Sequence, residues 1–343
     1  MKNSKIILSG TPPRILPTLL KGFNTIANHA YLILFPIGVD LLLWLGPKLR
    51  LKNLIQPFVN QFSSDMVKIS PPELLDSVKA SQTIWEQLLT QFNLATSVRT
   101  FPVGIPSIMA RQSPIDSPLG SDWIYEVPNF RLALLILIGL LLVGFFLGSI
   151  YFYLISRVTS SEVEEFSNEK LFLVFIQSLL MFCLLVAAIL IISIPLMLLL
   201  SVLSLINIGI GQVFLLVVAF AFIWLVMPLV FSPHGVFVLK QKALPSMLIS
   251  IRLVRLFLPG TGLFVMTCAL ISEGLNTLWT MPGSTSWLTL FGIGGHAFIV
   301  TGLLAASFIY YREGLKWMQD NLQRIADATK EKQENGGTTL GQQ

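Results

Sequence analysis

Six long apolar runs, separated by shorter polar segments, dominate the chain. Because an α-helix rises about 1.5 Å per residue, about 20 apolar residues cross a hydrocarbon core of about 30 Å. The pattern therefore predicts an all-α, polytopic transmembrane helical bundle with six spans. These are expected at about 26–46, 132–156, 171–195, 211–232, 256–278 and 288–311.

The third and fourth spans belong to one apolar stretch, residues 171–232. A turn is expected at Asn207–Gly211, where glycine permits a sharp reversal. Pro195 lies in the first half of the stretch and predicts either a kink or the end of the helix, because proline removes a helical hydrogen bond. In the second case, residues 196–206 would lie at the outer interface.

Residues 47–130 separate the first two spans and are predicted to form a small helical cap outside the membrane. One helix is expected over 49–67, and a second is expected to begin at Ser70, an N-cap before Pro71. Residues 101–130 are rich in Pro, Gly and Ser and should be irregular. Packing on the outer membrane face is the favoured role of the cap, and ligand binding is the alternative.

Composition and charge favour a membrane protein and orient it. Charged residues make up 12% of the chain, about half the share found in soluble domains. With the N-terminus inside, 15 of the 23 Lys and Arg residues fall in cytoplasmic segments, as the positive-inside rule requires. We therefore expect a multi-pass protein of the bacterial plasma membrane, with residues 1–25 and 312–343 in the cytoplasm. Four tryptophans fall at the opposite interface: Trp44, Trp123, Trp279 and Trp287.

The chain has a net charge of +5, and its Lys and Arg residues lie beside the apolar runs. This position indicates contacts with anionic lipid rather than nucleic acid. Four basic residues between the fourth and fifth spans are predicted to contact lipid headgroups: Lys240, Lys242, Arg252 and Arg255. Membrane lipids are thus the expected partners, and a second copy of the chain or a partner membrane subunit is a further candidate.

The sequence contains no recognisable catalytic or cofactor-binding motif. Pro259–Gly262 lacks both the spacing and the lysine of a phosphate-binding loop. Cys183 and Cys268 lie inside apolar runs, and the three histidines share no metal-ligand spacing. We therefore expect no cofactor, no metal site and no enzymatic activity.

Small residues recur at four-residue spacing in two spans. Gly144 and Gly148 form a GxxxG pattern in the second span, and Gly302 and Ala306 form a similar pair in the sixth. Such residues let helices approach closely in lipid. They predict helix packing, although chance in a glycine-rich membrane chain explains either pair alone equally well.

Three ionisable residues lie inside predicted spans at similar depth: Asp40, Glu273 and His296. A lone charge in the bilayer costs on the order of 3 kcal/mol or more, so each needs a partner or water. The functional interpretation is an intramembrane polar site. The alternative is that each residue reaches the interface or forms a structural pair.

One segment carries a family resemblance. It contains Pro228 at the end of a span, the cationic loop Lys240–Lys242, and the amphipathic segment Ala243–Val254. Over about residues 227–270 this resembles the membrane domain joined to bacterial glycerophosphodiester phosphodiesterases and YciC-like proteins, largely of unknown function. The resemblance implies six helices and no reaction, and the long 47–130 region departs from the pattern.

These features favour a non-enzymatic scaffold or accessory subunit in envelope or lipid organisation. The alternative is a small transporter or permease subunit, supported by the ionisable residues and by the helix breaks. The third interpretation, an intramembrane enzyme, lacks a convincing nucleophile.

The charge asymmetry makes the topology testable. Cysteines introduced at Ser113 and Ser284 should react with an impermeant thiol reagent added outside intact cells, whereas cysteines at Ser161 and Thr338 should not. Labelling of the Ser161 variant from outside would break the six-span arrangement.

Overall fold

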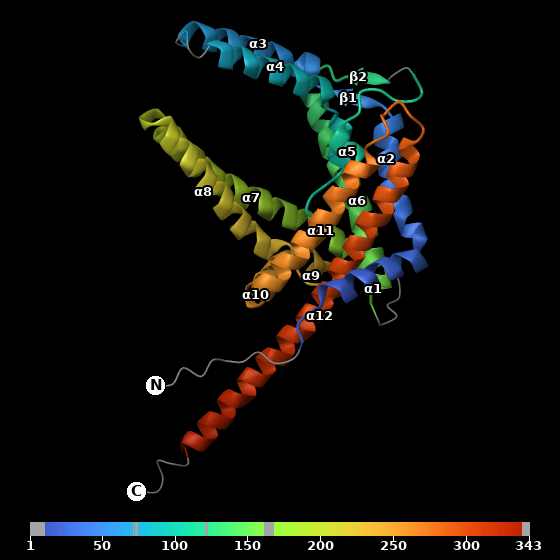
Figure 1. Cartoon of the computed structure of the whole chain (residues 1–343), viewed down its shortest axis with the longest axis vertical. Coiled ribbons are helices and arrows are strands. Elements are labelled where there is room, and N and C mark those ends of the chain that lie inside the picture. The colour runs from blue at the N-terminus through green and yellow to red at the C-terminus, as the bar shows by residue number, and fades with distance from the viewer. Residues whose placement is uncertain (1–10, 71, 73–74, 121–122, 161–167, 338–343) are drawn as a thin grey trace. The chain divides into compact units, whose positions relative to one another are not determined.

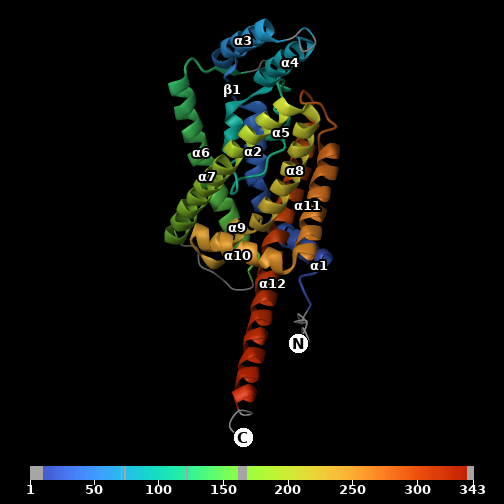
Figure 2. The ribbon, with the colours of Figure 1, turned by 90° about the vertical axis from the view of Figure 1, so that its left-hand side faces the viewer.

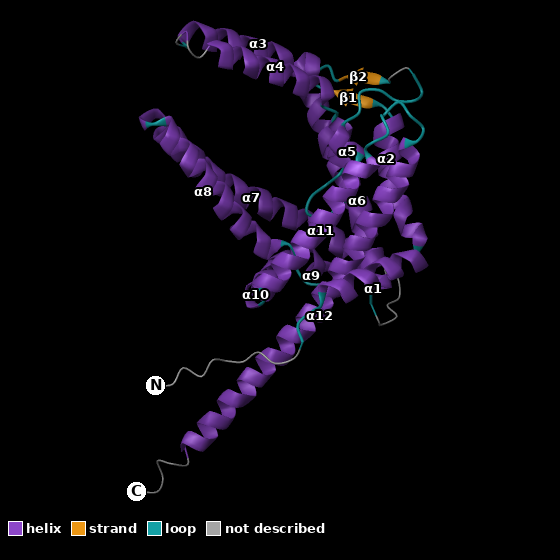
Figure 3. Cartoon of the chain, in the orientation of Figure 1, coloured by secondary structure: helices purple, strands orange, loops and turns teal. Residues whose placement is uncertain are grey.

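The computed structural model describes residues 11–70, 72, 75–120, 123–160 and 168–337. The chain is 81% helical with almost no strand, which confirms the all-α prediction (Figure 3). Two short strands were not foreseen. β1 (Lys48–Arg50) and β2 (Ile124–Glu126) pair in parallel.

Five helical segments of the described chain are long and apolar enough to cross a membrane: Phe130–Val158, Glu169–Ile206, Gly209–Leu239, Leu258–Trp279 and Thr289–Asp327. A sixth exists if α1 (Ile15–Asn28) and the segment Ala30–Leu45 count together, with a bend of 92° between them. The first span therefore differs from the uninterrupted helix expected over 26–46, because His29 has a non-helical backbone conformation.

The chain divides into two compact units. The first takes in the residues up to Asn28, Ile155–Ala269, and the chain from Gly302 onward. The second takes in His29–Leu154 and Leu270–Thr301. Three helices contribute to both: α6 (Phe130–Val158), α11 (Leu258–Trp279) and α12 (Thr289–Gly337).

In the first unit, α7 (Asn168–Ile206) and α8 (Ile208–Val226) run side by side as a hairpin (Figures 1 and 2). The helix α7 continues through Pro195, so the alternative in which it ends there is wrong. The reversal falls at Asn207, whose Oδ1 accepts a hydrogen bond from the Gly209 backbone N–H at 2.8 Å. No residue in the most apolar part of α7 is buried, and many of its apolar side chains are exposed, among them Ile191, Met197 and Leu198.

The core of the first unit is aromatic. Residues of η4 (Met227–Leu229), α9 (Ser232–Leu239) and α10 (Ala243–Leu256) pack closely together. The His234 ring lies against Phe308 and Tyr311, and its Nε2 is 2.7 Å from Ser307 Oγ. A buried histidine with a hydroxyl partner therefore joins α9 to α12.

The helix α1 packs on α12 through small residues. A Cβ atom at Gly22 would lie 2.6 Å from Ala306, and Gly302 lies against the ring of Phe23. Glu313 then accepts a hydrogen bond from Lys21 at 2.7 Å. The small-residue pair of the sixth span thus lies at a helix–helix contact within the chain.

In the second unit, α3 (Lys52–Ile69) and α4 (Leu75–Gln91) form the helical pair expected before residue 101 (Figure 1). Ser70 ends α3 with its N–H bonded to Met66, and α4 begins at Leu75. Pro71, Ser161 and Thr338, named in the sequence-based predictions, lie outside the described residues.

The glycines of α6 do not face a helix as expected. A Cβ at Gly144 would overlap the carbonyl oxygen of Val98, and a Cβ at Gly148 would lie 2.8 Å from the Cα of Gly104. The partner of this GxxxG face is therefore an irregular segment, which we call the 93–112 loop. It contains η3 (Leu94–Val98) and α5 (Met109–Gln112).

This packing predicts that leucine substitutions at two glycines of α6 lower the free energy of unfolding by different amounts. Replacing Gly144 with Leu should lower the free energy of unfolding by about 1–3 kcal/mol, because the side chain displaces the loop. Gly139→Leu is the matched control, since nothing lies within 4 Å of a Cβ at Gly139. Thermal unfolding in mild detergent measures the difference. Equal midpoints for the two variants would contradict the contact.

Candidate functional site

The 93–112 loop lies against the middle of an apolar helix. Gly144, which contacts the loop at Val98, has 14 residues of α6 on either side of it. Half of the residues of the loop are buried, including Val98, Val103, Ile105, Ser107, Ile108 and Met109. An irregular segment thus lies midway along the length of a helix that is apolar enough to span a membrane.

Local side chains satisfy the backbone of this loop. Asn93 caps η3, and its Oδ1 accepts hydrogen bonds from the backbone N–H groups of Ala95 at 3.0 Å and Leu49 at 2.9 Å. The hydroxyl of Thr100 donates to the carbonyl of Val103 at 2.6 Å. Asparagine and threonine make such bonds readily, so these residue types suit a buried turn.

Asp40 is fully buried on α2 (Leu34–Leu45) and binds the loop directly. Its Oδ1 accepts a hydrogen bond from the Ser107 hydroxyl at 2.5 Å and another from the Met109 backbone N–H at 2.9 Å. Its Oδ2 is buried without a hydrogen-bond partner among the described residues. One carboxylate oxygen therefore fixes the loop, and the other can still accept a bond from water or a ligand.

Glu273 is paired with the same segment of the loop. It lies on α11 and forms an ion pair with Arg111 of α5, both side chains being about half exposed. Residues 107–111 therefore connect two carboxylates that lie on different helices.

His296 on α12 is buried, and its Nδ1 is 2.8 Å from Oδ1 of Asn276. Asn276 lies one helical turn beyond Glu273 on α11. The Nε2 of His296 is buried and has no hydrogen-bond partner in the described structure. The three residues singled out from the sequence thus belong to one unit, and each hydrogen-bonds to a partner outside the set.

A fourth ionisable residue, Arg99, interacts electrostatically with two of these three residues. The guanidinium of Arg99 interacts electrostatically with both Asp40 and His296, and Glu273 interacts with His296. Sequence reasoning missed Arg99 and Arg111 because it considered only the ionisable residues inside predicted spans. The signal available was their position among Pro, Gly and apolar residues, which differs from the charged helices before them.

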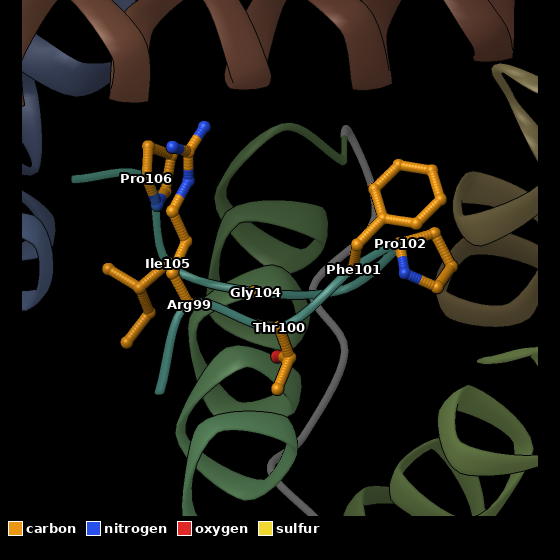
Figure 4. A pocket seen from close by; sticks show the side chains of 7 residues that line it. All are labelled: Arg99, Thr100, Phe101, Pro102, Gly104, Ile105 and Pro106. Carbon is orange, nitrogen blue, oxygen red and sulfur yellow. The ribbon is translucent and has the colours of Figure 1, made fainter. Parts of the chain in front are cut away.

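Beside Arg99 the loop forms an open depression of about 360 Å³, lined by Arg99, Thr100, Phe101, Pro102, Gly104, Ile105 and Pro106. Figure 4 shows Arg99 and Phe101 projecting to the same side of the loop, whereas Thr100 points away from them. The depression therefore combines one cation with apolar walls.

The predicted headgroup contacts lie in the first unit. Lys242, Arg252 and Arg255 are exposed, whereas Lys240 folds back to donate to the carbonyl of Phe237 at 2.6 Å. Among the described residues, no group of His, Cys, Asp and Glu is placed to hold a metal ion.

Comparison with known proteins found no matching family model, curated protein or solved structure.

The bond between Asp40 and Ser107 can be measured by a double-mutant cycle. We expect Asp40→Asn and Ser107→Ala to be coupled by about 1–2 kcal/mol, because the first removes the charge that strengthens the buried hydrogen bond and the second removes its donor. The control pairs Asp40→Asn with Gln112→Ala, which alters an exposed residue of α5, the short helix that follows Ser107. Additive effects in the first cycle would show that Asp40 does not hold the loop.

Proposed function

We propose that this chain is a small transporter or permease subunit whose polar site is built on the 93–112 loop. The observation that carries the proposal is the position of that loop, which lies beside the midpoint of an apolar helix, with Arg99 between the two residues, Val98 and Thr100, that lie against Gly144. The sequence alone favoured a scaffold, and the geometry supports the alternative better.

The physical argument rests on the cost of polar groups in lipid. Irregular backbone at membrane depth is tolerated only where it is buried in protein or lines a water-filled cavity. Half of the residues of the 93–112 loop are buried, but Arg99 and Phe101 are exposed. Because an arginine facing lipid tails is costly, the exposed side of the loop is best placed in a hydrated path.

A scaffold or accessory subunit is the second candidate, and the α7–α8 hairpin favours it. The hairpin buries almost none of its apolar surface within the chain. Lipid or a partner membrane subunit would cover this surface in the bilayer. The two proposals are compatible if the chain is the solute-binding subunit of a larger assembly.

The proposal includes a location. The excess of Lys and Arg near both ends of the chain supports the plasma membrane with both termini in the cytoplasm. In that orientation, the α3–α4 pair lies outside the cell.

Transport through the loop requires water to reach it from both sides of the membrane. In a background with Cys183 and Cys268 replaced by Ala, a cysteine at Phe101 should react with a charged thiol reagent in right-side-out and in inverted vesicles. Leu142→Cys is the matched control, because Leu142 is an exposed residue of α6 close to Gly144. We expect the Phe101 variant to react at least about tenfold faster, since only a hydrated thiol ionises readily.

Labelling in both vesicle orientations supports a path across the membrane. Labelling from one side only, or at the rate of the Leu142 variant, overturns transport through this loop and leaves the scaffold proposal.

A further inference from the structure

The charges around the 93–112 loop are unequally compensated. Arg111 forms an ion pair with Glu273, so its charge is neutralised within the protein. Arg99 is exposed, and no described carboxylate lies within ion-pair distance of it. Its interaction with Asp40 acts over a longer range, because the hydrogen bonds of the Asp40 carboxylate are made to Ser107 and Met109. The positive charge of Arg99 is therefore available to a ligand.

The depression beside Arg99 has two kinds of wall. Arg99 presents a planar set of N–H donors that suits carboxylate and phosphate oxygens. The remaining lining is mainly apolar, and Phe101 is about two-thirds exposed on the same side of the loop (Figure 4). A ligand that satisfies both walls carries an oxyanion at one end and hydrocarbon at the other.

The volume of the depression and its position along α6 limit the kind of ligand further. The depression measures about 360 Å³, near the lower limit of about 300 Å³ for small-molecule pockets. It can hold a headgroup while leaving a long apolar chain outside. Because the loop lies at the middle of α6, such a chain would extend into the hydrocarbon region.

We propose that Arg99 binds the oxyanion headgroup of an acidic membrane lipid in this depression, with the acyl chains against Phe101 and Pro102. This rests on the proposed function, since it names the substrate class of the same site. The guanidinium gains a charge-assisted partner, and the headgroup exchanges bulk solvent for fixed donors.

The test measures lipid binding to the purified, delipidated full-length protein by native mass spectrometry. Wild type should bind phosphatidylglycerol about tenfold more tightly than phosphatidylcholine, and Arg99→Gln should abolish this preference. Arg131→Gln is the matched control, because Arg131 is an exposed arginine near the start of α6. It should keep the preference, as should Arg99→Lys, and thermal unfolding checks that each variant is folded.

Three outcomes overturn the inference. An unchanged preference in Arg99→Gln would exclude Arg99 as the binding group. An equal loss in Arg131→Gln would assign binding to general surface charge. Inorganic phosphate that displaces phosphatidylglycerol at similar affinity would show that the apolar chain contributes nothing and that the site takes a free anion. A failure of the lipid-binding inference can be told apart from a failure of the proposed transport function. Thiol labelling at residue 101, which tests transport, requires no lipid ligand.

Discussion

The arrangement of the second unit depends on the hydrogen bonds that Asp40 makes to the 93–112 loop. A loop packed along an apolar helix must satisfy its own backbone, because lipid offers no hydrogen-bond partners. Asp40 accepts from Ser107 and from the backbone of Met109, while Asn93 and Thr100 supply further local bonds. The carboxylate is thus a structural group first, because it holds the loop that carries Arg99 and Arg111.

The glycine face of α6 complements the hydrogen bonds of Asp40, because it leaves room for the loop that they hold. Larger side chains on this face of α6 would occupy the volume of the 93–112 loop, and Asp40 of α2 could not then hold the loop there. Gly144 and Gly148 leave this volume free. The same spacing on α12 serves a helix, α1, through Gly302 and Ala306. One small-residue pattern therefore supports two kinds of close contact, and the residues on the opposing segment decide which forms.

The two units carry different physical signals. The second unit concentrates ionisable groups, including Arg99, Arg111, Glu273 and His296, on or against one irregular segment. The first unit has an aromatic core around His234 and an apolar hairpin that remains largely uncovered. Charge within an apolar setting is costly and indicates a site for polar ligands, whereas uncovered apolar surface is ordinary for helices that face lipid. This difference is why the proposed site lies in the second unit.

The sequence by itself determined the class of protein and the positions of most helices, because apolar runs of sufficient length report membrane-spanning helices without any knowledge of contacts. It also identified Asp40, Glu273 and His296, since ionisable residues in such runs are costly wherever they pack. Only the tertiary structure decided their partners and the path of the 93–112 loop. Hydropathy describes each segment alone, and the prolines and glycines of residues 101–130 predicted only an irregular part of a cap outside the membrane. That Val98 and Gly104 lie against Gly144 and Gly148 depends on contacts between segments about 40 residues apart, which no local pattern encodes.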